Sequence, residues 1–176
     1  MNGDVVGVSP QLAQLIQGLG PTRGANRAAA VGQALIAAAE GKLRVGVPFP
    51  FSMHAELLYY WLSALGLEAP RDLDMRTVPP SRMADAVRGA EIDVFCVGEP
   101  WGSVAVDDGA AEIILPGSAI WGFAPEKVLA VRHDWAEERR DCALRLIRAL
   151  WRAGRWLGEP RNRLTASAIR EEPSSY

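Results

Sequence analysis

A run of residues with possible binding chemistry follows the apolar segment that ends at Val97. Gly98 and Glu99 lead into Pro100 and Trp101, so a predicted strand turns directly into a predicted helix. Free N–H groups at the start of a helix, together with its dipole, can hold an anion without a charged side chain. Gly98 would let a ligand approach the backbone closely. On the residues alone, a tight turn without a ligand is the favoured interpretation.

Two more side chains could act on an anion. Lys127 follows Pro125 and Glu126 and opens an apolar run. If it points into a cleft, its ammonium group would balance one monovalent anion, whereas a solvated strand end is the plainer alternative. Glu126 could pair with Lys127 or face solvent. His54 lies near the start of a predicted helix, where the dipole favours a neutral, hydrogen-bonding imidazole, although an ordinary local partner would also explain it.

No arrangement of residues predicts an enzyme. Ser52 and His54 are too close in sequence to trust as a nucleophile and its base, and no acid partner is evident. Cys96 and Cys142 are expected to be small, buried, free thiols. The chain has two histidines and no clustered Cys/His spacing, so neither a zinc site nor another cofactor is expected. The residues therefore favour binding over catalysis.

The composition narrows the class of protein. The chain has 176 residues, 49% of them hydrophobic, and a net charge of −2, which is typical of a globular domain with a real core. A direct nucleic-acid partner is not expected, because that would need a strong basic patch. The first residues lack a basic and an apolar region, so no signal peptide is predicted, and the localisation stays open.

Short apolar runs alternate with longer amphipathic stretches. The predicted strands are Asp4–Ser9, Leu43–Val47, Leu73–Val78, Ile92–Val97, Glu112–Leu115 and Lys127–Val131. The first predicted helix begins at Pro10, with Ser9 as its cap. The other predicted helices are Asn26–Glu40, Met53–Leu65, Ser81–Arg88 with Ser81 as cap, Glu99–Val106 and Asp134–Leu157. This order predicts an α/β fold with a mostly parallel sheet and helices on both faces. In such sheets ligands bind at the carboxyl ends of strands.

The long helix has two interpretations. Its arginines and tryptophans could belong to a helix that lies on a membrane surface. The stripe formed by Leu144, Ile147, Leu150 and Trp151 instead favours a helix that packs on a core, and we expect core packing.

Four motifs in order resemble one known family. They are residues 49–54 (FPFSMH) with 60–62 (YWL), 78–80 (VPP), 95–101 (FCVGEPW) and 125–129 (PEKVL). Together they resemble the nitrate- and bicarbonate-binding solute receptors of ABC transporters and the related cytoplasmic nitrate/nitrite sensors called NasS. The resemblance covers roughly residues 4–160.

The resemblance implies a periplasmic-binding-protein-like (type II) fold, in which two lobes clamp the ligand. Residues 1–160 would be the second lobe, with the first lobe absent, and residues 161–176 a C-terminal tail. Asp4–Ser9 would arrive from the first lobe, and Lys127–Val131 would return to it. Without that lobe, Phe51, Trp101 and Trp121 would be bared on the cleft face, so a homodimer through this face is one expectation.

The resemblance also implies ligand contacts, at His54, Val97 and Lys127. The backbone of Val97 and Gly98 would donate to the anion, and Lys127 would supply the positive charge. The residues expected to support these contacts from behind are Ser52, Glu99, Trp101 and Glu126. In bicarbonate-binding relatives an acidic residue and calcium replace this lysine, so Lys127 favours nitrate or nitrite with no metal.

Several functions stay open at this point. One is an extracytoplasmic receptor that delivers a small inorganic anion to an ABC permease. Another is a cytoplasmic sensor that controls an RNA-binding antiterminator protein. Less favoured are an enzyme of thiamine-precursor synthesis, which would need a clear set of Cys, His and metal ligands, and a remnant that binds nothing.

Overall fold

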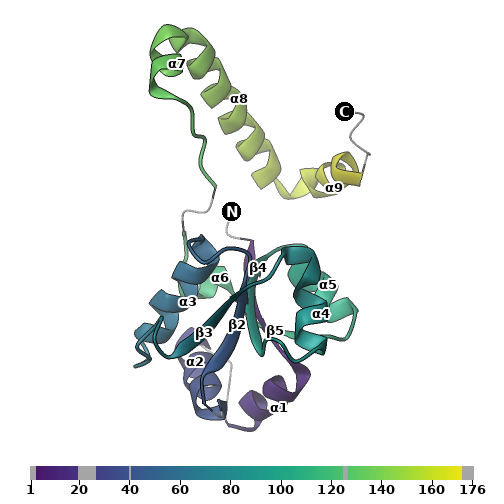
Figure 1. Cartoon of the computed structure of the whole chain (residues 1–176). Coiled ribbons are helices and arrows are strands. Elements are labelled where there is room, and N and C mark those ends of the chain that lie inside the picture. The colour runs from purple at the N-terminus through teal and green to yellow at the C-terminus, as the bar shows by residue number, and fades with distance from the viewer. Residues whose placement is uncertain (1–2, 20–26, 40, 125–126, 172–176) are drawn as a thin grey trace. The chain divides into compact units, whose positions relative to one another are not determined.

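The computed structural model divides the chain into two compact units, Met1–Lys127 and Val128–Tyr176 (Figure 1). It describes residues 3–19, 27–39, 41–124 and 127–171. Sequence analysis placed no boundary after Lys127, and the extent of a lobe over residues 1–160 stays a prediction.

A five-stranded sheet forms the centre of the first unit, with the order β3-β2-β4-β1-β5. The strands are β1 (Asp4–Val8), β2 (Leu43–Val47), β3 (Leu73–Thr77), β4 (Val94–Gly98) and β5 (Glu112–Pro116). β2 pairs in parallel with β3 and β4, whereas β1 runs antiparallel to both of its neighbours, β4 and β5. Four strands therefore share one direction and β1 opposes them, which confirms the mostly parallel α/β sheet.

The side chains of the strands alternate between the two faces of the sheet, and each face has its own hydrophobic core. On β4, Val94 and Cys96 pack on one face, while Phe95 and Val97 pack on the other. The first face is covered by α1 (Pro10–Gly18), α2 (Arg27–Ala38) and α3 (Met53–Ser63), and the second by α4 (Met83–Arg88) and α5 (Trp101–Asp107). Figure 1 shows these helices around the twisted strands. Helices on both faces were predicted, and the structure confirms them.

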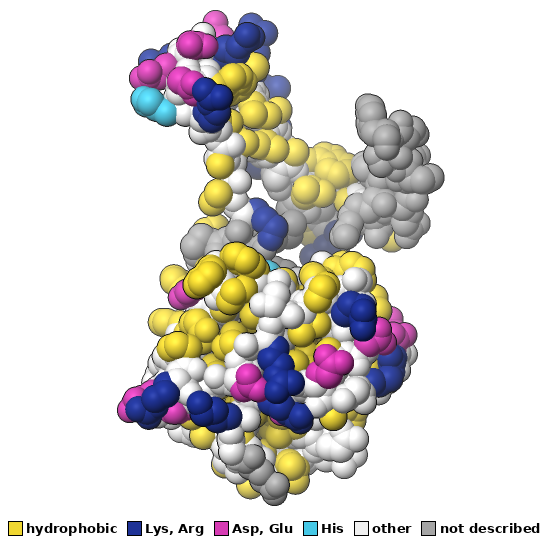
Figure 2. Space-filling model, in the orientation of Figure 1, with side chains coloured by type: hydrophobic (Ala, Val, Ile, Leu, Met, Phe, Trp, Pro, Cys, Tyr) yellow, Lys and Arg dark blue, Asp and Glu magenta, His cyan; other side chains and the backbone are white. Residues whose placement is uncertain are grey.

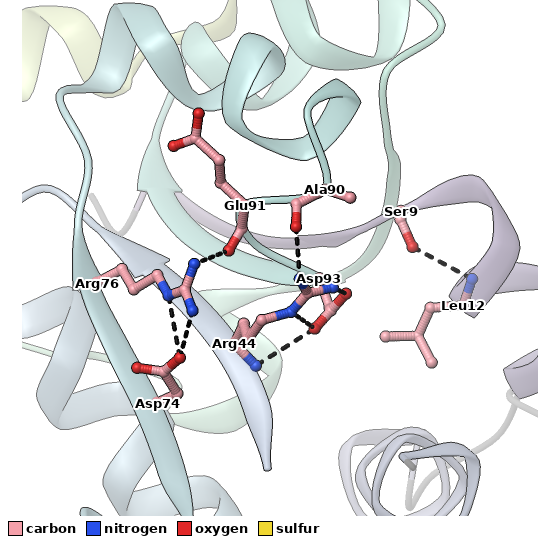
Figure 3. Close-up of polar contacts among 8 residues, drawn as sticks. All are labelled: Ser9, Leu12, Arg44, Asp74, Arg76, Ala90, Glu91 and Asp93. Carbon is pink, nitrogen blue, oxygen red and sulfur yellow. Dashed lines mark hydrogen bonds and ion pairs between the residues drawn. The ribbon is translucent and has the colours of Figure 1, made fainter. Parts of the chain in front are cut away.

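Polar contacts fix the ends of several elements (Figure 3). Ser9 caps α1, because its Oγ accepts a hydrogen bond of 3.3 Å from the backbone N–H of Leu12, and Pro10 is the first helical residue, as predicted. Arg44 on β2 holds Asp93, just before β4, with Nε–Oδ2 and Nη2–Oδ1 distances of 2.7 and 2.5 Å. The fork of Arg44 thus ties the starts of β2 and β4 together.

Two predictions, one of a helix start and one of a strand, are wrong. Ser81 does not cap a helix: Pro80–Arg82 is a 3₁₀ turn, and α4 then begins at Met83 without a side-chain cap. Lys127–Val131 is not a strand, because the structure gives these residues no regular conformation. A strand needs a neighbour for its N–H and C=O groups, and none of the described strands pairs with this segment.

The second unit is helical and exposed. The predicted long helix is broken at Arg139 into α7 (His133–Glu138) and α8 (Arg140–Gly158), and a further helix, α9 (Arg163–Glu171), follows. The stripe predicted to pack on a core is exposed instead, with Leu144, Ile147, Leu150 and Trp151 at 40, 53, 49 and 61% exposure. The spacing identified an amphipathic helix correctly but could not say whether this chain supplies a surface for it. Within the described residues, no helix is long and apolar enough to cross a membrane.

Candidate functional site

A cavity of about 340 Å³ opens in the first unit, where the parallel strands end. Pro48 follows β2, Pro80 lies beyond β3, and Gly98 closes β4. The residues that line the cavity are Gly3, Asp4, Pro48, His54, Pro80, Gly98, Glu99, Trp101 and Lys127. It therefore lies where open α/β sheets place their ligands.

β1 brings an acidic group into this cavity. Because β1 is antiparallel to β4, its first residue, Asp4, lies opposite the last residue of β4, Gly98. The Asp4 side chain is 1% exposed and contacts His54, with 3.3 Å between Oδ1 and Nε2. A Cβ atom added to Gly98 would meet these same two atoms, at 3.6 and 3.8 Å. Gly98 thus borders the pair formed by Asp4 and His54.

One of the backbone N–H groups at the start of α5 already donates to a side chain of the same protein. A carboxylate oxygen of Glu99 accepts a hydrogen bond of 3.0 Å from the N–H of Ser103, and the N–H of Glu99 donates to the carbonyl of Gly3 at 2.9 Å. An anion at this helix terminus would therefore compete with an internal carboxylate. The predicted seat on free helix amides is correspondingly weaker than the sequence indicated.

The structure brings together only part of the predicted set. His54, Gly98 and Lys127 line the cavity, as do Glu99 and Trp101. The Val97 side chain is instead fully buried in the core beneath α4 and α5, so only its backbone is near. Ser52 does not line the cavity, and its hydroxyl donates to the carbonyl of Phe49 at 2.6 Å. Glu126 lies outside the described residues.

Asp4 is the functional candidate that the sequence did not reveal. It opens an apolar strand, a position where an acidic residue looks like a solvated strand end. The available signal was its isolation before a run of valines. No spacing rule indicated that this strand would be inserted beside β4 and so carry Asp4 to the cavity.

The two cysteines behave differently. Cys96 is buried, and desolvation together with the nearby charge of Asp4 raises the pKa of its thiol. Cys142 is exposed, so the prediction that both cysteines are buried is wrong for it. Both thiols are free. Across the described part of the chain, no three His, Cys, Asp or Glu residues gather in a way that could hold a metal ion.

The chain matches the model of the NMT1-like family over residues 1–170. It belongs to this family. It is 37% identical over 118 residues to the bicarbonate transport ATP-binding protein CmpC of Synechococcus elongatus, covering 67% of this chain and 18% of that protein. It is 34% identical over 125 residues to the nitrate/nitrite binding protein NrtA of the same organism, covering 70% of this chain and 28% of that one. The chain thus spans under a third of these relatives.

Solved structures agree with this membership. The periplasmic nitrate-binding protein NrtA from Synechocystis PCC 6803 superposes with a TM-score of 0.71 at 28% identity, over 92% of this chain and 40% of that one. The alkanesulfonate-binding protein SsuA from Xanthomonas axonopodis shares the fold, with a TM-score of 0.65 at 17% identity over 96% of this chain and 49% of that one. The resemblance drawn from the four motifs and the periplasmic-binding-protein-like fold are both confirmed.

Proposed function

We propose that this chain is a solute-binding module for a small monovalent anion, nitrate or nitrite, in an ABC-type import system. The observation that supports this is one cavity, at the carboxyl ends of β2, β3 and β4, lined by His54, Gly98 and Lys127 together. The relatives that carry nitrate or bicarbonate transport in their names support the same class of ligand.

One cation, Lys127, lines the cavity together with the carboxylates of Asp4 and Glu99. Lys127 supplies a positive charge, and Asp4 is in contact with His54. An anion held away from water needs such a countercharge, because its burial would otherwise be costly. A lysine in this position makes a metal ion redundant, which favours nitrate or nitrite over the calcium-assisted bicarbonate binding that the resemblance describes.

Binding is proposed here rather than catalysis. Among the described residues that line the cavity there is no serine, threonine or cysteine to act as a nucleophile. Cys96 lies in the core and its raised thiol pKa makes it a poor nucleophile.

The test is calorimetric titration with nitrate, nitrite and bicarbonate, each with and without calcium. The chain has two lysines, which provide a matched pair of variants. Lys127→Gln is expected to weaken nitrate binding by about tenfold or more, because the cation that lines the cavity is lost. Lys42→Gln, at an exposed lysine that does not line the cavity, is expected to bind like the wild type. Heat from neither nitrate nor nitrite, or an unaffected Lys127→Gln variant, would contradict the proposal.

The partner in this proposal is an ABC permease, with the binding module outside the cytoplasm. The alternative is a cytoplasmic NasS-type sensor that holds an antiterminator protein and does not itself touch nucleic acid. Two free thiols suit the reducing cytoplasm and so favour this alternative. Isolation of the native protein from cells grown with and without nitrate would separate them, since only the sensor should exchange a soluble protein partner when the anion appears.

A further inference from the structure

Asp4 has a chemical setting unlike that of any other acidic residue described. Its side chain is 1% exposed, whereas the acidic groups of the other ion pairs in the described structure lie at 29% or more. Burial of a carboxylate is unfavourable unless it is used in a polar contact. One such contact joins its Oδ1 to Nε2 of His54, at 3.3 Å.

The two ring nitrogens of His54 have opposite surroundings. Nε2 faces a carboxylate, which accepts hydrogen bonds and does not donate them when ionised. Nδ1 is buried, and among the described residues it has no hydrogen-bond partner. A proton on Nδ1 would therefore be a buried donor without an acceptor, whereas a proton on Nε2 faces Asp4.

The helix adds to the same preference. His54 is the second residue of α3, which begins at Met53, so its ring lies near the amino end of the helix dipole. That end favours negative charge and disfavours additional N–H donors. A lone pair on Nδ1 and a proton on Nε2 suit both the helix and Asp4.

We propose that Asp4 is a positioning residue of the anion cavity, which keeps the ring proton of His54 on Nε2, the nitrogen beside Gly98. His54 in its neutral form then presents an N–H donor to an anion at that place. The Nε2–Oδ1 contact is longer than the roughly 2.7–2.9 Å of a strong charge-assisted hydrogen bond, which leaves this N–H available to a ligand. The inference gives the proposed function a second donor besides Lys127, and it rests on that function for its role in binding.

The tautomer can be measured without any anion. The chain has two histidines, so the variant His133→Gln leaves His54 as the single ring in the spectrum. His133 is 88% exposed and lies in the second unit, so this change does not touch the cavity. Long-range ¹H–¹⁵N correlation at a pH where the ring is neutral is expected to show a protonated Nε2 and an unprotonated Nδ1. A proton on Nδ1, or an even mixture, would overturn the inference.

The variant Asp4→Asn tests whether Asp4 is the cause. Its neutral amide can turn either its NH₂ group or its oxygen toward Nε2, so the preference for a proton on Nε2 is expected to weaken in the same spectrum. An unchanged tautomer would refute the role of Asp4. Should Asp4→Asn fail to fold, as judged by circular dichroism, the wild-type spectrum still decides the tautomer, which is the first half of the inference.

The direction in which Asp4→Asn changes the affinity for nitrate gives a further test. If only charge mattered, removal of a carboxylate beside an anion would strengthen binding. The positioning role predicts the reverse for Asp4→Asn, with nitrate bound about tenfold more weakly, because one donor becomes a lone pair. Glu99→Gln is the matched comparison: it removes the other carboxylate that lines the cavity and is expected to bind nitrate more tightly. Tighter binding by Asp4→Asn would overturn the inference.

If no variant binds nitrate while the tautomer is as expected, the proposed function fails and the role of Asp4 in setting the ring stands.

Discussion

The cavity combines one lysine, one histidine and two carboxylates, so its preference for an anion depends on how these groups are arranged. Asp4 is held against His54, and Glu99 is used at the start of α5. Both carboxylates thus have local partners, and Lys127 lines the same cavity as a cation. The preference of the cavity for an anion therefore depends more on the contacts that these side chains already make than on their number.

Sequence alone could identify the residues that belong to local motifs. His54, Gly98 and Lys127 lie within the motifs that resemble the family, and all three line the cavity. Asp4 could not be found in this way, because its place depends on pairing between residues that are more than ninety positions apart. The burial of the Val97 side chain agrees with a role for its backbone alone, and that role stays a prediction.

The two thiols should differ in reactivity. Cys96 is buried with a raised thiol pKa, so little of the reactive thiolate form exists near neutral pH, whereas Cys142 is exposed. A disulfide reagent such as DTNB is expected to modify one thiol per native chain and two after unfolding in denaturant. Cys142→Ser should abolish the fast native reaction. Rapid modification of the folded Cys142→Ser variant would show that Cys96 is accessible after all.

At the scale of elements, the strands and helices of the first unit could be predicted well, because hydrophobic periodicity there reports burial that the chain itself provides. β2 was placed at its observed bounds, and β5 differs by one residue. The failures lie at Lys127–Val131 and at α8, where the pattern is that of a buried element but no described surface covers it. Hydrophobic periodicity identifies the face of an element that is apolar, but it does not show which surface covers that face.

The antiparallel pairing of β1 with β4 requires a glycine at position 7. A Cβ atom on Gly7 would lie 2.2 Å from the ring of Phe95, which is fully buried and cannot move aside easily. Gly7→Ala is therefore expected to lower the free energy of unfolding by about 1–3 kcal/mol, as overpacking of a core does. Urea unfolding followed by circular dichroism would measure it. Gly18→Ala is the control, because nothing lies within 4 Å of its added Cβ, and it should cost nothing.

At the scale of the whole molecule, the second unit has no buried residue among those described. A helix in water gains most of its stability from packing its apolar face, so α8 needs a covering surface. In the space-filling view the hydrophobic side chains form a visible band on this unit (Figure 2). The first unit also exposes aromatic residues, with Phe51, Trp101 and Trp121 at 84, 37 and 41%.

These exposed apolar faces predict self-association of the isolated chain. Size-exclusion chromatography with light scattering, at tens of micromolar protein, is expected to report a mass above the 19.0 kDa of one chain. The double variant Ile147→Glu/Leu150→Glu places charges in the stripe of α8 and should shift the protein toward a monomer. Arg148→Glu, on the flank of the same helix, controls for the added negative charge. A clean wild-type monomer would refute this expectation.

The direction of β1 has a consequence for how the chain acquires its structure. Residues 4–8 are synthesised before the segments with which they pair, residues 94–98 and 112–116. The central ladder of the sheet therefore cannot close until most of the first unit has been synthesised, and its contacts are among the most distant in sequence, which slows folding. Until then β1 is an unpaired, valine-rich segment. Its opening aspartate, the group that later contacts His54, is the charged residue of this otherwise apolar segment.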